Sequence, residues 1–172
     1  MTQPQYVTTS VGWGVLHLFC KVTDRTDGQR VVAAVKQIQD SDHQVLCVAL
    51  FGHKADIGFM ALGPDLWRLR RLQSQLQQAG LVVADSYISM TETSEYAPDL
   101  PEEMKTPRLH PELPPEGKNA FCFYPMSKRR ESDGNWYTLP YETRRELMYE
   151  HGKSGRNFRG RILQVVTGST GV

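Results

Sequence analysis

The first half of the chain carries two hydrophobic periods, one typical of strands and one of helices. Strands are predicted where apolar residues alternate or run continuously, and helices where they recur every three or four positions. The expected elements are strands over 13–22, 45–51, 57–62 and 81–93, and helices over 31–38 and 66–76. The order strand, helix, strand, strand, helix, strand predicts the split βαβ arrangement of a ferredoxin-like sandwich, an α+β fold.

A proline-rich stretch then interrupts this periodicity. Six prolines fall among acidic residues over 94–117. Because proline lacks a backbone N–H and fixes φ, the pattern predicts an extended linker that lies over the surface. We therefore expect an N-terminal ferredoxin-like domain over 1–96, a linker over 97–117 and a second domain over 118–172.

The second domain shows only half of the same pattern. The expected elements are a short aromatic strand over 119–124, a basic polar loop over 127–138, a helix beginning at 139–140 and a strand within 160–167. Strand, helix, strand is the first half of a second ferredoxin-like unit. Half a unit leaves a sheet face and a strand edge uncovered. The sequence therefore predicts either a fragment or a partner that completes the fold.

Composition narrows the class of protein. The 172 residues are 40% hydrophobic and 23% charged, which is typical of a folded domain. No apolar run approaches the ~20 residues that cross a bilayer, and residues 1–10 lack the pattern of a secretion signal. We therefore expect a cytoplasmic protein with no membrane span. Cys20, Cys47 and Cys122 lie in apolar runs, which predicts buried thiols rather than a disulfide framework or a zinc site.

The net charge of +1 hides an asymmetry between the two halves of the chain. Residues 1–117 hold 10 basic and 14 acidic side chains, whereas residues 118–172 hold 10 and 5. The two parts therefore carry −4 and +5, and an anionic ligand would favour the second. Ordinary solvated side chains explain the same counts, and composition alone leaves both interpretations open.

His151 is the first candidate for chemistry. It lies near the end of the helix expected from Pro140, four residues after Leu147 and three after Met148, and so shares a helix face with both. A histidine here could ligate a metal or a haem iron, or could be stabilised by the dipole at a helix C-terminus. No second ligand stands at the helical spacing of a zinc motif. Of the metal interpretations, a single-histidine haem ligand is therefore favoured.

Three further features of the second half have a functional and a structural interpretation. Tyr124 ends the aromatic strand, where its phenol could face a cleft or simply pack. The run Lys128-Arg129-Arg130 could bind carboxylates or phosphates, or could be a solvated loop. Gln164 lies in an apolar strand-like run, where its amide needs partners if it faces inward and none if it faces solvent.

Two other functions lack their motifs. RNA-binding modules share the split βαβ topology, but no strand here carries their aromatic and glycine pattern. A phosphate-binding loop would need a glycine at P-loop spacing before Lys153-Ser154, and none is present. We therefore expect no nucleic-acid partner.

Four motifs in the second half resemble those of a known family. They are FCFYPMSKRR over 121–130, NWY over 135–137, LPYE over 139–142 and EHG over 150–152. In this order, they make the chain similar to the coproheme decarboxylases of the chlorite dismutase-like superfamily. Residues 11–93 resemble the family's N-terminal ferredoxin-like half in layout.

The resemblance implies a role for each matching residue. His151 corresponds to the proximal ligand of the haem iron, Tyr124 to a tyrosine proposed to form a radical, and Lys128 to a lysine beside the reacting propionate. Tyr124 and Lys128 are thus the implied catalytic residues. The implied substrate-binding or cofactor-binding residues are Arg108 and Met126 near propionates, Tyr124, Lys128, and Gln164 near the sixth coordination position of the iron.

The implied reaction is the hydrogen peroxide-dependent decarboxylation of iron coproporphyrin III (coproheme) to haem b. Two propionates become vinyl groups and two molecules of carbon dioxide leave, so the iron porphyrin is both cofactor and substrate. Its four carboxylates suit the basic second half of the chain. The resemblance also implies a homo-oligomer, a pentamer. Members of the family continue beyond the position of Val172, so a missing C-terminal part is a further expected partner.

Two other haem-related functions compete with this one. A haem-binding or haem-transfer module would keep His151 without catalysing decarboxylation. Chlorite dismutase shares the fold and a proximal histidine, but does not need Tyr124 and Lys128 beside propionates. The presence of both residues favours decarboxylation, and an RNA-binding module ranks last.

Overall fold

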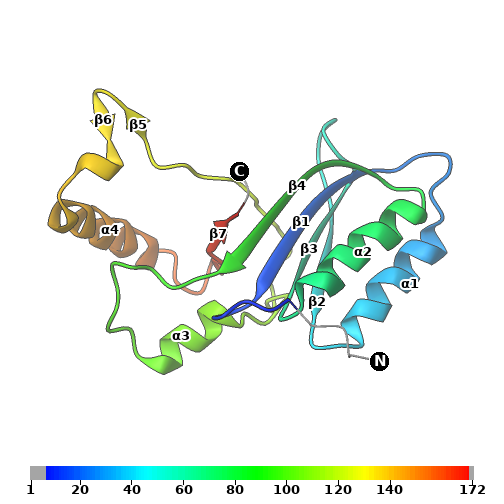
Figure 1. Cartoon of the computed structure of the whole chain (residues 1–172), viewed down its shortest axis with the longest axis horizontal. Coiled ribbons are helices and arrows are strands. Elements are labelled where there is room, and N and C mark those ends of the chain that lie inside the picture. Colours follow the sequence, from blue (N-terminus) through cyan, green and yellow to red (C-terminus); the bar gives the residue numbers. More distant parts are fainter. Residues whose placement is uncertain (1–6, 171–172) are drawn as a thin grey trace. The chain divides into compact units, whose positions relative to one another are not determined.

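The structure is a computed structural model that describes residues 7–170. The first six elements are β1 (Gly14–Lys21), α1 (Gly28–Gln39), β2 (Gln44–Ala49), β3 (Ile57–Gly63), α2 (Leu66–Gln78) and β4 (Val82–Thr91). They follow the order predicted from the hydrophobic periods, and Figure 1 shows them along the chain. The ferredoxin-like α+β prediction is therefore confirmed for this part of the protein.

Five strands form one antiparallel sheet in the order β2-β3-β1-β4-β7, where β7 is Thr167–Ser169. The central strand β1 sets the register of the sheet. His17 on β1 stands opposite Met60 on β3 and Tyr87 on β4. Both faces of β1 are buried, so the His17 side chain is 5% exposed, and this burial lowers its pKa to about 4.

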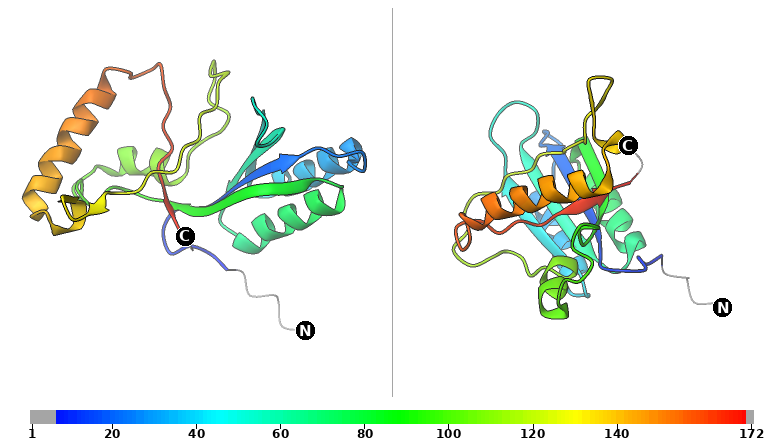
Figure 2. Two further views of the ribbon diagram at one scale, coloured as in Figure 1. Left: turned by 90° about the horizontal axis from the view of Figure 1, so that it is seen from above. Right: turned by 90° about the vertical axis from the view of Figure 1, so that its left-hand side faces the viewer.

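Helices α1 and α2 cover one face of this sheet, as Figure 2 shows. Their apolar residues pack on alternate positions of the strands, because side chains on a strand alternate between faces. The core cluster consists of Leu16, Leu18, Cys20, Ala34, Ile38, Val45, Phe59, Ala61, Leu69, Leu72, Leu76 and Leu81. Burial of this set is the main stabilising contribution to the sandwich.

Short-range signals fix the ends of both helices. The Asp27 side chain accepts hydrogen bonds from two N–H groups of the first turn of α1, and the Asp65 side chain accepts one in α2. Gly80 follows the last turn of α2 with φ +90°, a conformation that favours glycine. A Cβ there would lie 2.2 Å from the Arg25 carbonyl oxygen, so no other residue fits without a shift of the backbone.

The prediction of an extended linker over 97–117 is wrong for its middle, which forms α3 (Glu102–Leu109). The helix begins directly after Pro101, and acids in its first turn favour the helix dipole. Glu102 also pairs with Lys105 at 3.0 Å. The prolines therefore mark the boundaries of a short helix, and only Pro107 lies inside it.

The residues described form two compact units. The first contains 7–93, 101–114 and 165–170, and the second contains 94–100 and 115–164. Within the first unit, Gln44 joins β2 to the segment after α3, through the Pro111 carbonyl at 2.9 Å and the Leu113 N–H at 2.7 Å. The proline-rich stretch is thus divided between the two units.

The second unit contains β5 (Arg130–Glu131), β6 (Gly134–Asn135), the short 3₁₀ turn η1 (Trp136–Thr138) and α4 (Tyr141–Arg156). The helix expected from 139–140 is confirmed, and the basic loop contains a small hairpin. The strand expected over 119–124 is absent, and of the range 160–167 only Thr167 lies in a strand, the start of β7. A strand needs a second strand with which to form a ladder, and no strand of the described residues pairs with 119–124.

Candidate functional site

The predicted site residues belong to two different units. Arg108 lies in the last turn of α3, in the first unit, where its guanidinium donates to the Met104 carbonyl. The remaining candidates, Tyr124, Met126, Lys128, His151 and Gln164, all belong to the second unit. The second unit therefore holds both implied catalytic residues and the implied iron ligand.

Tyr124 and Met126 lie in an irregular segment rather than at the end of a strand. Their side chains are 62% and 73% exposed. This exposure argues against the alternative that Tyr124 is merely a packing residue. It leaves the phenol and the thioether accessible to a ligand.

The three consecutive cations of the basic run have different environments. Arg129 contacts two carboxylates, at 2.7 Å to Glu131 and 2.9 Å to Asp133, and its charge is therefore compensated. The Arg130 guanidinium lies 4.7 Å from the ring centroid of Tyr137. The interpretation that both arginines bind an anionic ligand is weakened for Arg129, because its guanidinium already contacts two carboxylates.

Lys128 makes no ion pair within the described residues. Its ammonium lies 4.2 Å from the ring centroid of Trp136 and donates to the sulfur of Met148 at 3.6 Å. An aromatic face attracts a cation without neutralising it. No acid of the described residues therefore compensates the charge of Lys128.

His151 is exposed on α4, three residues after Met148. Positions three apart lie on one face of a helix, so His151 and the residue that contacts Lys128 share a face. The helix continues to Arg156, with Lys153 and Arg156 in its last turn. His151 therefore precedes the last turn, where the dipole effect is concentrated, and the alternative of a dipole-stabilised histidine loses its basis.

No residue of α4 is buried, although Leu147 is one of its apolar side chains. The helix face that Leu147, Met148 and His151 share is thus not buried by other residues of this unit. An exposed leucine next to an exposed imidazole is able to contact a flat apolar ligand that carries a metal.

Gln164 is exposed and lies outside any strand, so its predicted strand environment is wrong. The alternation of Ile162 to Val166 has no neighbouring strand to bind in the structure. The amide of Gln164 therefore faces solvent, the second of its two sequence interpretations.

An aromatic cluster supports the hairpin and was not predicted as part of the site. The Tyr96 ring stacks on Tyr141 at 5.5 Å and meets Trp136 edge-on at 6.1 Å. The Arg144 guanidinium lies 5.8 Å from the centroids of Tyr96 and Tyr141. Tyr96 comes from the acidic, proline-rich stretch, where no local periodicity indicates a contact with residues forty positions later.

The described residues contain no group of three or more His, Cys, Asp or Glu side chains able to hold a metal ion. A metal at His151 would therefore have to bring its other ligands, as the iron of a porphyrin does. The cysteines do not change this picture. Cys20 is buried, and this burial raises the pKa of its thiol to about 11, whereas Cys47 and Cys122 are exposed, contrary to the prediction of three buried thiols.

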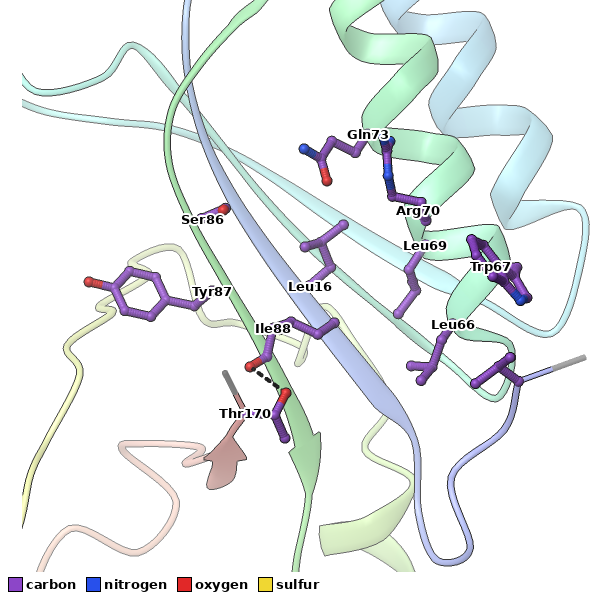
Figure 3. Close-up of a pocket in the computed structure, with 11 residues that line it drawn as sticks. Leu16, Leu66, Trp67, Leu69, Arg70, Gln73, Ser86, Tyr87, Ile88 and Thr170 are labelled. Carbon is purple, nitrogen blue, oxygen red and sulfur yellow. Dashed lines mark hydrogen bonds between the residues drawn. The ribbon is translucent and has the colours of Figure 1, made fainter. Parts of the chain in front are cut away.

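A groove of about 500 Å³ lies in the first unit, between α2 and the strands β1 and β4. Figure 3 shows Leu66 and Leu69 of α2 pointing toward Leu16 and Ile88, with Arg70 near one end. None of the site residues predicted from the sequence lines it. None of the helices in the part of the chain described here is long and apolar enough to cross a membrane.

Comparison with known proteins identifies the family. The chlorite dismutase family matches residues 25–172, so the chain belongs to the chlorite dismutase family. It is similar to a structure described as a novel heme-binding protein from Thermus thermophilus, with 28% identity and a TM-score of 0.76. That match covers 95% of this chain and 76% of the other.

A second solved structure shares the fold. It is described as a proposed chlorite dismutase, with 20% identity and a TM-score of 0.56, and the match covers 84% of this chain and 69% of that one. The resemblance recognised from the sequence motifs is thus confirmed at the level of the superfamily.

Proposed function

We propose that this protein binds iron coproporphyrin III through His151 and catalyses its hydrogen peroxide-dependent oxidative decarboxylation to haem b. The observation that carries the proposal is the geometry of the second unit. An exposed histidine on α4 lies one turn after the methionine that contacts Lys128, whose charge no acid of the described chain compensates. Membership of the chlorite dismutase family and the similarity to a heme-binding protein support a haem-related function.

The residues present fit the substrate. A porphyrin supplies four nitrogen ligands to its iron, so the protein has to add only one, the imidazole of His151. The open face of α4 offers Leu147 to the apolar macrocycle. The four carboxylates of coproporphyrin, twice the number in haem b, meet a part of the chain with uncompensated cations.

Tyr124 and Lys128 have the catalytic roles in this proposal. Each conversion removes one carbon dioxide and one hydrogen from a propionate and leaves a vinyl group, a two-electron oxidation that reduces one hydrogen peroxide to two waters. The bound iron porphyrin supplies the redox chemistry. The Tyr124 phenol gives up its hydrogen atom and then takes one from the propionate, and the Lys128 ammonium holds the carboxylate that leaves.

Two further residues of the second unit belong to the proposed pocket. Met126 lines it near a propionate, and its 73% exposure leaves it accessible. In this proposal Gln164 lies near the open coordination position of the iron, as the resemblance implies. We further propose that the protein acts in the cytoplasm as a homo-oligomer, a pentamer.

A haem-binding or haem-transfer module is the second candidate function. It is favoured by the description of the Thermus thermophilus relative as a heme-binding protein. Such a module needs His151 and the open face of α4 but not the Tyr124 phenol. Product formation separates the two functions.

The decisive experiment follows both binding and product. Ferric coproporphyrin III is titrated into the protein while the Soret band is recorded, hydrogen peroxide is then added stepwise, and the porphyrins are analysed by mass spectrometry. Decarboxylation predicts a three-propionate intermediate followed by haem b. A shifted Soret band without either product would support the binding module, and an unshifted band would contradict both functions.

A further inference from the structure

Lys128 is held by two side chains that carry no negative charge. Its ammonium lies 4.2 Å from the ring centroid of Trp136 and 3.6 Å from the sulfur of Met148. Both groups attract a cation, the ring through its quadrupole and the thioether as a weak acceptor. An acid in either place would compensate the charge, as Glu131 does for the neighbouring Arg129.

The hairpin places the ring of Trp136 beside this lysine. The backbone N–H of Trp136 donates to the Arg129 carbonyl at 2.9 Å, one rung beyond the pair formed by Arg130 and Asn135. Asn135 then caps the following turn by accepting a hydrogen bond from the Tyr137 N–H at 2.9 Å. The backbone on both sides of Trp136 is thus fixed relative to residue 128.

Met148 connects the same ammonium to the helix of the candidate iron ligand. It precedes His151 by three residues on α4, about 4.5 Å along the helix axis. Because the helix is a continuous element, the position of the sulfur fixes the ammonium relative to the His151 imidazole. Two independent elements, the hairpin and α4, therefore converge on Lys128.

We infer that Trp136 and Met148 are positioning residues, which hold the Lys128 ammonium in place while leaving its charge free for a carboxylate of the porphyrin. This inference rests on the proposed function, because Lys128 is assigned to the substrate there. The physical reason is competition. A resident carboxylate would have to be displaced by the substrate carboxylate, whereas an indole face and a thioether leave the ammonium available.

The test compares two porphyrins that differ in their carboxylates. Ferric coproporphyrin III carries the propionates that react, and haem b carries vinyl groups in their place. Trp136→Leu is expected to raise the Kd for coproporphyrin roughly two- to five-fold, the size of an exposed cation–π contact, and to leave the Kd for haem b unchanged. Met148→Leu keeps the volume and removes the sulfur, so we expect a smaller rise in the same direction.

Two control variants separate positioning from loss of structure. Trp136→Phe keeps an aromatic face and is expected to restore most of the affinity for coproporphyrin. Phe158→Leu removes a comparable contact in the same unit, that of Arg161, 5.6 Å from its ring centroid, and is expected to change neither Kd. If Trp136 had a purely structural role, its substitution would raise the Kd for both porphyrins equally. That result would overturn the inference.

A ligand-free measurement tests the geometry itself. The indole ring is expected to shift the ε-methylene protons of Lys128 upfield in the NMR spectrum, and Trp136→Leu is expected to abolish the shift. An unshifted Lys128 in the wild type, or an unchanged Kd for coproporphyrin in Trp136→Leu, would overturn the inference. A wild type that binds coproporphyrin but forms no product contradicts only the proposed decarboxylation, because the ratio of the two Kd values still reports on the positioning.

Discussion

The two units of this protein are held together by different forces. In the first, α2 spans 13 residues and buries Leu69, Leu72 and Leu76 against the sheet. In the second, α4 spans 16 residues and buries none. The longer helix therefore gains less from hydrophobic packing within its own unit, and its apolar side chains remain available to something else.

The basic side chains of the second unit have two kinds of partner. Acids compensate Arg129 and Arg145, at 2.7 Å in both cases. Lys128, Arg130 and Arg144 instead lie over aromatic rings. Cation–π contacts at exposed sites contribute only about 0.5–1 kcal/mol each, so this arrangement adds little stability and leaves positive charge for an anionic ligand. The first unit thus buries the apolar face of its helix α2, whereas the second leaves Tyr124, Lys128 and His151 exposed.

The largest effect that the comparison predicts is on catalysis by the second unit. Tyr124→Phe removes the phenol hydrogen and keeps the ring, so product formation should be abolished while the affinity for ferric coproporphyrin III stays close to that of the wild type. Product is measured by mass spectrometry after peroxide addition and affinity by Soret titration. Haem b formation at the wild-type rate would rule out the proposed role of Tyr124.

The next largest effect is a difference in stability between leucine truncations in the two units. Leu72→Ala empties a site that is 1% exposed and should lower the free energy of unfolding by about 2–5 kcal/mol. The same truncation on α4, Leu147→Ala at 45% exposure, should change it by less than about 0.5 kcal/mol. Chemical denaturation measures both variants. Equal losses would show that α4 is packed as tightly as α2.

A smaller effect comes from the histidine at the centre of the sheet. Burial lowers the pKa of His17 to about 4 from 6.5, so between these values the unfolded chain binds a proton that the folded chain does not. Stability should therefore fall as the pH falls through this window, by about 2 kcal/mol between pH 7 and pH 5. His43, whose pKa burial also lowers, contributes in the same direction.

Urea unfolding at the two pH values measures this effect. His17→Leu removes the titrating group and should flatten most of the pH dependence. A variant that keeps the full wild-type slope would show that other groups in the first unit cause it.

The fold of the first unit was predictable because its strands and helices have each other as partners. Alternating residues such as Leu16 and Leu18 indicate a strand face, and that face is covered by helices with their own apolar period. The same reasoning failed over 119–124 and 162–166. There the alternation is present, but the described chain offers no strand to pair with, and periodicity alone cannot supply one.

The candidate site was predictable only in part. The motifs place Tyr124, Lys128 and His151 in the second unit, and the structure shows that all three are exposed there. The contacts that surround Lys128 depend on a hairpin rung and on a helix twenty residues later, which no local pattern encodes. Burial of cysteines was also overestimated, because Cys122 lies in an apolar run that does not form a strand.

The most direct test of the account is whether the open face of α4 holds the iron through His151. Ferric coproporphyrin III is added to the wild type and to His151→Ala, and the Soret band and the electron paramagnetic resonance spectrum are recorded side by side. The account predicts a shifted Soret band and an axially ligated iron in the wild type, both lost in the variant. Identical spectra for the two proteins would contradict it, because some other group would then ligate the iron.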